Sequence, residues 1–468
     1  MLCERRREQT IVPSISIDSR ALAHGYVQFL GLSQGRRRSP IPASHAPLQL
    51  LRLDESTSRD RRETMRGGKR FFGWSVAWAA FALAVFAWGI GFYGPPVFLQ
   101  TLHSSRGWSI SEISAAITFQ FLLSALLIAY LPEIHRKFGI AGTSFGGALL
   151  MAVGLVGWSS AWQPWQLFVA AIPSAAGWAT TSGAALNSIV ARWFQRDRPK
   201  AMGLAFNGAS VGGVLFVPLW LFLIDRFGFQ IAALSVAIVT VSAVALLSAR
   251  YFNPTPASLG LAPDNDSATA AVAKPAPRLS RSEIILTPRF LTLSVAFALA
   301  LFAQIGLLSH LIVRLTPDVG VASAGLLVSL ATICAMLGRT LAGRWIGDHD
   351  RRIGAAVNIA VQIIGVLLLI FGNGGMLLTL GCILFGLGIG NLISLPPLIA
   401  QQEFEREDVV TVVALIVAIN QAVFAFAPAL VGALRDATSD YLLPFGIIAC
   451  IQLLAATIVL VGRGKATS

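Results

Sequence analysis

Arg339 lies inside a long apolar stretch of the chain, where a cation is unusual. A charged side chain in the middle of a bilayer costs about 3 kcal/mol or more unless it meets an anion, a carbonyl group or water. The planar guanidinium donates two parallel hydrogen bonds, which suits a carboxylate. We therefore expect Arg339 to contact an anionic substrate. The alternatives are that it extends to the nearby helix end or belongs to a gate.

His310 lies in another apolar stretch, and imidazole titrates close enough to neutral pH to take up and release a proton. Every acidic residue after Met65 falls in an expected loop or at a helix end, so the sequence does not indicate an acid-mediated proton relay. His310 is therefore the candidate proton-coupling site. The alternative is a histidine that only forms a hydrogen bond between helices.

Amide side chains in the apolar stretches supply further polar groups. Gln304, Asn420 and Gln421 are the candidates for lining a substrate cavity, because His310 or Pro428 lies near them in the sequence. Buried amides between membrane helices also bridge neighbouring helices, at about 1 kcal/mol each. A packing role for these three residues therefore stays open.

These residues belong to twelve apolar stretches that are separated by short polar connections. Most stretches reach the roughly 20 residues that a helix needs to cross a bilayer. Such continuous runs predict helices and not the alternating strands of a membrane barrel. The expected fold is an all-α membrane protein of twelve transmembrane helices, at residues 74–101, 110–132, 140–162, 165–191, 201–224, 229–249, 290–315, 321–347, 353–372, 375–400, 409–434 and 440–462.

Basic residues gather at every second connection. From Arg66 onward, one set of connections holds twenty Arg and Lys residues and the other holds four, with the intramembrane Arg339 left out. The positive-inside bias then predicts that both termini are cytoplasmic. The net charge of +13 reflects this topology and contact with anionic membrane lipid, and we expect no nucleic-acid partner.

Composition and small motifs divide the chain further. Residues 1–70 are basic and lack an apolar period, which predicts a disordered extension, and translation could start at Met65. A linker rich in Pro, Ala and Ser, residues 251–289, separates six-helix bundles at 71–250 and 290–463, and 464–468 form a cytoplasmic tail. The sequence contains no P-loop and no zinc-protease motif, and we expect neither enzymatic activity nor a cofactor or metal.

Glycine and proline indicate where helices pack closely or bend. Four glycines in residues 201–224 predict close approach to a neighbouring helix: Gly203, Gly208, Gly212 and Gly213. Three proline sites predict bends because proline removes an intrahelical hydrogen bond: Pro95-Pro96, Pro173 and Pro396-Pro397.

The connection after the eighth stretch, residues 338–352 with the sequence GRTLAGRWIGDHDRR, resembles the signature of the major facilitator superfamily. That resemblance implies two six-helix bundles with a central substrate site and alternating access. Acidic and basic residues of this signature can pair across the two bundles and bias one access state. The expected gating residues are Asp348, Arg344, Arg351, Arg352 and, in the degenerate matching loop PEIHRKFG at 132–139, Arg136. The alternative is that the arginines only anchor the topology.

The resemblance narrows to the monocarboxylate-transporter-like branch through GFYGPPVFL at 91–99, GWS at 107–109, ARWF at 191–194 and AMG at 201–203. This branch implies proton-linked symport of small carboxylates by a Lys in the first helix and an Asp and an Arg in the eighth. Arg339 matches the Arg, but Tyr93 and Ala335 occupy the other two positions. We expect Tyr93 to line the cavity.

The sequence therefore predicts a secondary transporter of a small organic solute, more specifically a carboxylate, in the inner membrane of the cell. We expect a monomer. A drug or metabolite efflux antiporter of the same superfamily is the alternative, although the proline of the efflux motif is absent from residues 208–213. A non-transporting membrane sensor or receptor, or a channel, is an alternative of another class.

Overall fold

The computed structural model describes residues 71–265, 279–345, 350–405 and 408–463. The predicted disordered extension, Asp348 and the tail at 464–468 lie outside the described residues, as do the side chains of residues 342–345. The described residues belong to one compact unit, Lys69–Ser468.

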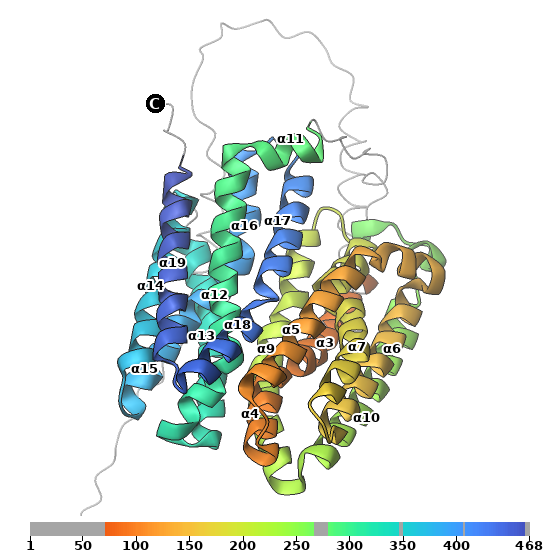
Figure 1. The fold of residues 1–468 in the computed structure, drawn as a ribbon. Helices are drawn as coiled ribbons and strands as arrows, with labels where there is room; N and C mark the ends of the chain where they lie inside the picture. Colours follow the sequence, from red (N-terminus) through yellow and green to blue (C-terminus); the bar gives the residue numbers. More distant parts are fainter. Residues whose placement is uncertain (1–70, 266–278, 346–349, 406–407, 464–468) are drawn as a thin grey trace, which may run out of the picture. The chain divides into compact units, whose positions relative to one another are not determined.

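The first part of this unit, which we call the N-terminal half, consists of helices that run up to Phe252. Figure 1 shows them in orange to yellow-green. They are α3 (Phe72–Gly91), α4 (Gly94–Arg106), α5 (Ile110–Ala129), α6 (Leu131–Ser160), α7 (Trp165–Thr181), α8 (Gly183–Ala191), α9 (Arg198–Phe227), α10 (Phe229–Leu247) and the π-helical turn η1 (Ser248–Phe252).

The second part, which we call the C-terminal half, begins at Pro288 and is green to blue in Figure 1. Two 3₁₀ turns, η2 (Ala257–Leu259) and η3 (Pro263–Asn265), and the short helix α11 (Arg281–Leu286) precede it. Its helices are α12 (Pro288–Val319), α13 (Val321–Trp345), α14 (Arg351–Phe371), α15 (Gly375–Ile389), α16 (Asn391–Glu403), α17 (Val409–Phe424), α18 (Ala427–Thr438) and α19 (Leu442–Val461).

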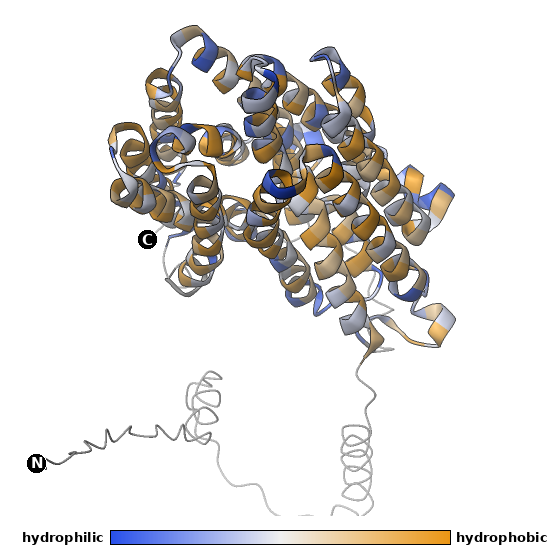
Figure 2. Ribbon diagram, turned by 90° about the horizontal axis from the view of Figure 1, so that it is seen from below, coloured by the Kyte–Doolittle hydropathy of each residue, from blue (hydrophilic) through white to orange (hydrophobic). Residues whose placement is uncertain are grey.

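The described residues form helices and contain no strand, which confirms the all-helical fold class. Among the described residues, eleven helical segments are long and apolar enough to cross a membrane. The remaining predicted crossing, residues 165–191, is divided at Ser182 into α7 and α8, of 17 and 9 residues. Figure 2 shows hydrophobic residues along the helices and hydrophilic residues mainly at their ends.

Several crossings are broken, and the breaks explain how polar groups reach the interior. The first crossing breaks between α3 and α4, directly before Pro95 and Pro96, which occupy the first turn of α4. The break between α15 and α16 lies at Gly390, one and a half turns before Pro396 and Pro397. In contrast, α7 continues through Pro173. Backbone groups at such breaks lack intrahelical partners and become available to side chains.

Glycines allow close packing of helix pairs within each half. A Cβ atom on Gly208 would collide with the carbonyl oxygen of Phe81, and one on Gly212 would lie 2.6 Å from that of Val85, so α9 packs directly on the backbone of α3. Gly338 of α13 faces the backbone of Leu387 in α15 in the same way. The prediction of close packing is confirmed at Gly208 and Gly212, whereas Gly203 faces open space.

The predicted linker is attached to both halves at its ends. Near its start, the carboxylate of Asp264 accepts hydrogen bonds from the backbone N–H groups of Gln195 and Arg196 at 2.8 and 2.6 Å. Near its end, the N–H of Leu279 donates to Asp408 at 3.1 Å. The linker is therefore anchored to the N-terminal half on one side and to the C-terminal half on the other.

Four helix pairs make the main contacts between the two halves: α9 packs on α13, α5 packs on both α18 and α17, and α4 packs on α12. The pair of α9 and α13 brings together the helices that carry Gly213 and Thr332. The contacts of α5 with α18 and of α4 with α12 form the closed end of the structure.

Candidate functional site

Hydrogen bonds join the two halves at the end where α5 begins. The carboxylate of Asp436 in α18 accepts a hydrogen bond from the N–H of Ser111, at 2.8 Å. Ser111 is in the first turn of α5, where backbone N–H groups have no partner within the helix. An acidic group is also stabilised electrostatically at a helix N-terminus. Asp436 of one half thus caps a helix of the other half.

The reverse contact lies one to two turns further along the same helix pair. The hydroxyl oxygen of Thr118 in α5 accepts a hydrogen bond from the N–H of Ala429, at 3.0 Å. Ala429 is in the first turn of α18, which starts after a break at Ala425 and Phe426. Each half therefore supplies a cap for a helix of the other. We call the end of the helices that carries these two contacts the closed face.

His310 lies in the closed face and is fully buried. Its Nε2 lies 3.0 Å from the carbonyl oxygen of Pro428 and 3.4 Å from the hydroxyl of Ser114, and its Nδ1 lies 3.1 Å from the hydroxyl of Tyr441. A carbonyl oxygen only accepts, so Nε2 carries the proton and Nδ1 accepts from Tyr441 in the neutral ring. Both ring nitrogens are satisfied without a charge.

The interior next to the closed face is filled by side chains. A cavity of about 10 Å³ remains between the halves, lined by Phe92, Pro95, Pro96, Ile117, Phe121, Ile305, Leu308 and Ser309. A water molecule needs a cavity of about 10–15 Å³ together with polar partners. This space therefore cannot hold an organic solute while the closed face is formed.

Arg339 lies toward the end of the helices opposite the closed face, where Phe71 and Arg463 are found. Its Nε donates to the carbonyl oxygen of Gly390, at 3.4 Å, where the break between α15 and α16 leaves that carbonyl accessible. The side chain is partly exposed. Within the residues that the structure describes, no Asp or Glu lies at ion-pair distance from it. Most of its N–H donors are thus available to an anion.

Tyr93 comes from the other half and lies close to this arginine. It occupies the break before α4 and is 6% exposed, and its ring lies beside Gly213 of α9 and Thr332 of α13. Thr332 lies two helical turns before Arg339 on the same face of α13. The structure therefore places Arg339 and Tyr93, two of the five residues that the sequence assigned to the substrate site, near each other across the two halves.

Gln304 lies elsewhere. Its carbonyl oxygen is 3.4 Å from the amide nitrogen of Gln362, and the carbonyl oxygen of Gln362 accepts from Gln452 at 3.2 Å. These three buried amides connect α12, α14 and α19 within the C-terminal half. In this structure the amide of Gln304 is used in packing between helices, and its place in the substrate cavity stays a prediction.

Asn420 and Gln421 occupy adjacent positions on α17. Asn420 is 4% exposed, and its Oδ1 has no hydrogen-bond partner among the described residues. A buried acceptor without a hydrogen-bond partner destabilises the folded state by about 1–3 kcal/mol. The Oδ1 atom of Asn420 is therefore a candidate to accept a hydrogen bond from a solute. Gln421 is partly exposed, and its backbone carbonyl accepts from Ala425 at the end of α17.

The predicted gating arginines behave differently from the expectation. Arg352 is 2% exposed and donates to both carboxylate oxygens of Glu403, at 2.5 and 2.7 Å, and also to Thr292 and to the carbonyls of Arg289 and Val459. All of these partners belong to the C-terminal half. In this structure Arg352 therefore pairs within its own half and ties α14 to α12, α16 and α19, and its gating role stays a prediction.

Arg351 also bonds within its own half, to the carbonyl oxygen of Leu398. Arg136 is exposed and forms no ion pair among the described residues. Asp348 and the side chain of Arg344 lie outside the described part, so their predicted gating role has no structural counterpart.

Asp350 closes the same end of α14. Its carboxylate caps the helix through the N–H groups of Arg352 and Ile353 and pairs with Arg463 at 2.8 Å. Burial raises the pKa of Asp350, but the hydrogen bonds from Arg463 and from the two backbone groups outweigh it and leave the pKa below its ordinary value. Asp350 is thus held as an anion that joins α14 to the end of the chain.

The sequence did not reveal the residues that close the opposite end. Asp436 and Thr118 look like an ordinary loop-end acid and a helix hydroxyl, and their partners lie 325 and 311 residues away. The only sign of this contact in the sequence was an acidic residue, Asp436, at the end of the eleventh apolar stretch. That its partner is Ser111 follows only from the fold.

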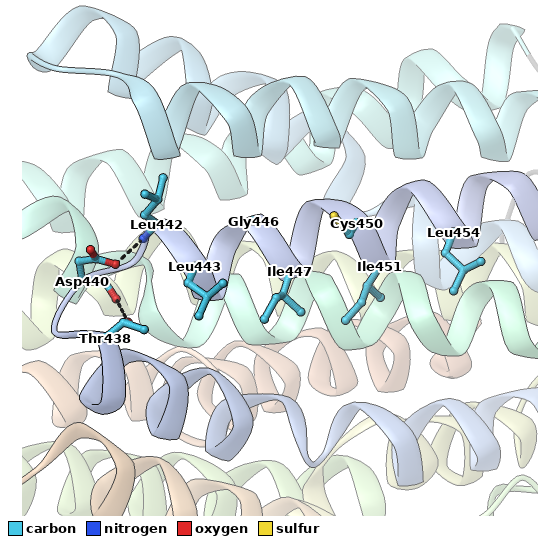
Figure 3. Close-up of a pocket in the computed structure, with 9 residues that line it drawn as sticks. All are labelled: Thr438, Asp440, Leu442, Leu443, Gly446, Ile447, Cys450, Ile451 and Leu454. Carbon is cyan, nitrogen blue, oxygen red and sulfur yellow. Dashed lines mark hydrogen bonds between the residues drawn. The ribbon is translucent and has the colours of Figure 1, made fainter.

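A groove of about 580 Å³ runs along α19 (Figure 3). Its lining is aliphatic apart from Cys450 and from Thr438 and Asp440 at one end, which use their polar groups on each other and on Leu442. Leu442, Leu443 and Leu454 are about half exposed, as expected for a membrane-facing surface. Without a free polar group to orient a solute, the groove does not qualify as the substrate site.

Comparison with known proteins relates this geometry to a family. The sequence profile described as Major Facilitator Superfamily matches residues 76–428. Monocarboxylate transporter 13 of Bos taurus is 26% identical over 292 residues, which is 62% of this chain and 64% of that protein. Monocarboxylate transporter 11 of Mus musculus is 28% identical over 174 residues, 36% of this chain and 38% of that protein. The chain therefore spans less than two thirds of these relatives.

Solved structures support the fold. The nucleoside transporter NupG aligns with a TM-score of 0.65 at 13% identity, over 85% of this chain and 100% of that chain. A bacterial homologue of the human lysosomal transporter Spinster, in an inward-facing and occupied conformation, aligns with a TM-score of 0.61 at 15% identity, over 86% of this chain and 100% of that chain.

Proposed function

This chain belongs to the Major Facilitator Superfamily, and we propose that it is a secondary active transporter that carries a small organic carboxylate by alternating access. The two moving bodies are the bundles at residues 71–250 and 290–463. The membrane is the inner membrane of the cell, with both termini cytoplasmic, as the positive-inside bias suggests. The closed face is then the one opposite the cytoplasm.

The observation that carries the proposal is Arg339, which has no ion-pair partner among the described residues, together with Tyr93. Arg339 is partly buried with N–H donors beyond its one bond to Gly390, and Tyr93 of the other half lies beside Thr332, on the same face of α13 as Arg339. A carboxylate that bridges both residues would neutralise the buried cation and link the two halves. That link would make solute binding favour one arrangement of the halves over another.

The names of the relatives support a carboxylate, since three of them are called monocarboxylate transporters. The proton partner differs from the pattern of that branch, because the acid position is Ala335, which is buried beside Gly390. We propose His310 as the proton-coupling residue for symport. It contacts the closed face directly, so its charge could be coupled to opening.

The proposal is tested by measuring the thermal stability of the purified protein with small mono- and dicarboxylates at about pH 5.5 and about pH 7.5, on either side of the imidazole pKa. We expect a carboxylate that stabilises the wild type to leave Arg339→Ala unchanged. Uptake into liposomes should fail for Arg339→Lys, because a point charge does not reproduce a two-point contact.

Arg314→Lys is the matched control, since Arg314 pairs with Asp318 at the end of α12, away from Arg339. Uptake by this variant should remain. Normal uptake by Arg339→Lys would refute the carboxylate contact. Stabilisation by cationic or apolar compounds alone would favour efflux and assign Arg339 to a gate.

A further inference from the structure

Aromatic rings of the N-terminal half form a continuous surface, which we call the aromatic wall and define as Trp88, Phe92, Trp178 and Phe206. The rings of Trp88 and Trp178 meet edge to face with centroids 5.0 Å apart, and Phe92 stacks on Trp178 at 6.2 Å and 20°. The ring of Phe206 meets the ring of Trp88 edge to face, with centroids 5.9 Å apart. The wall thus draws on α3, α7 and α9.

The aromatic wall ends next to the proposed anion contact. Phe92 and Tyr93 are consecutive residues at the break between α3 and α4, with ring centroids 5.1 Å apart. The Tyr93 ring in turn lies beside Thr332, which is two helical turns from Arg339 on the same face of α13. A ligand whose carboxylate reaches Arg339 and Tyr93 would therefore place its remaining atoms toward Phe92 and the rings behind it.

Part of the wall is accessible. Trp88, Phe92 and Phe206 are each partly exposed, whereas the core tryptophans Trp193 and Trp220 are 1% and 0% exposed. Rings of Trp178 in α7 and Phe206 in α9 contact Trp88, and part of its surface stays exposed. Partly exposed aromatic rings at the edge of an anion contact are typical of a small-molecule site.

The wall continues across to the C-terminal half. Phe121 of α5 lies 6.4 Å from Phe92 and 6.3 Å from Phe424 of α17. Asn420 precedes Phe424 by one helical turn and so shares its face of α17. Its buried Oδ1 has no partner in the described part of the chain, and it could accept a hydrogen bond from a ligand.

We infer that the carboxylate carried by this protein bears an aromatic ring, which the aromatic wall holds by stacking while Arg339 holds the carboxylate. This inference rests on the proposed function and specifies its substrate class. Aromatic contacts in offset or edge-to-face geometry add about 0.5–1.5 kcal/mol to the burial of the ring itself. A short aliphatic acid has no ring, so it gains neither the stacking nor the burial of a ring.

The test compares dissociation constants of the purified full-length protein for phenylacetate and indole-3-acetate with those for acetate and propionate. The two aromatic acids should bind at least about tenfold more tightly than acetate and propionate, because they gain both the stacking contacts and the burial of the ring. Trp88→Leu should lose about tenfold for indole-3-acetate and leave propionate unchanged. Trp88→Phe should retain most of the affinity, because it keeps a ring at the position.

Trp78→Leu is the control in the same helix, since Trp78 is 55% exposed and pairs with Phe81 instead of the wall. It should bind every acid as the wild type does. Equal or tighter binding of acetate and propionate would overturn the inference and leave the carboxylate proposal intact. If no carboxylate binds and Arg339→Ala behaves as the wild type, the proposed function fails, and the inference fails with it. Loss of all ligands equally in Trp88→Leu, with Trp88→Phe equally affected, would also overturn the inference.

Discussion

The carboxylate of Asp436 in the C-terminal half caps the N–H of Ser111 in the N-terminal half, at 2.8 Å. Thr118 returns the contact by capping Ala429 at the start of α18. A helix end without a cap exposes N–H groups that need a partner, and here the partner belongs to the other half. Opening the closed face therefore uncaps two helices together, which makes the face either fully formed or fully broken.

The Asp436 cap should control how often the closed face opens. A charge at a helix N-terminus contributes about 0.3–1 kcal/mol at an exposed site and up to about 2 kcal/mol when partly buried. We expect Asp436→Ala to increase opening by about twofold to thirtyfold. The measurement is the labelling rate of Ser114→Cys by a membrane-impermeant maleimide, in a background without the native cysteines.

Asp440→Ala serves as the control for that experiment. Asp440 lies at the same end, but its carboxylate bonds the N–H of Leu442 within its own half. Labelling of Ser114→Cys should be unaffected by this substitution. An equal increase in both variants would show that charge in general, and not the cap exchanged between halves, holds the face closed.

His310 should set the pH dependence of transport. A protonated ring has two N–H donors, so Tyr441 would have to reverse its hydrogen bond, and the new charge would lie in the field of Asp436, Arg435 and Arg314 near the closed face. Protonation is therefore expected to weaken that face and to raise uptake as pH falls. Uptake by His310→Gln should lose this dependence between about pH 5.5 and about pH 7.5. An unchanged pH profile would leave His310 as a packing residue.

Two glycines in α9 should respond in opposite ways to the same substitution. Alanine at Gly208 would force its Cβ into the backbone of Phe81, and such overpacking costs about 1–3 kcal/mol. Alanine at Gly203 meets nothing within 4 Å and gains up to about 1 kcal/mol of helix propensity. Thermal unfolding in detergent should show Gly208→Ala below the wild type and Gly203→Ala at or above it. Equal melting temperatures would contradict the close packing of α3 on α9.

Removing only one partner of the buried ion pair between Arg352 and Glu403 should strongly destabilise the protein. Removing one partner of a buried ion pair leaves an uncompensated charge and costs about 3–5 kcal/mol, and the 20% exposure of Glu403 places the expected loss at the low end. Arg352→Met should therefore lower stability strongly, and adding Glu403→Leu should restore part of it. Arg463→Met, which breaks the exposed pair with Asp350, should cost at most about 1 kcal/mol. Additive losses in the Arg352 and Glu403 double variant would rule out coupling between them.

The amino-acid sequence alone determined the helical fold, because apolar stretches of about 20 residues have one stable form in lipid. It also identified Arg339 as unusual, since the cost of a cation in an apolar helix does not depend on its neighbours. The superfamily signature at residues 338–352 led to the family, and the matching profile confirmed it.

Only the tertiary structure decided how side chains are shared between helices. Gln304 and Arg339 are both polar groups in apolar helices, yet one is bonded to Gln362 inside the C-terminal half and the other remains available beside Tyr93. A helix has several faces, and which of them turns toward another helix depends on packing that involves distant parts of the chain. The exchange of caps between Asp436 and Ser111, 325 residues apart, follows from the same cause.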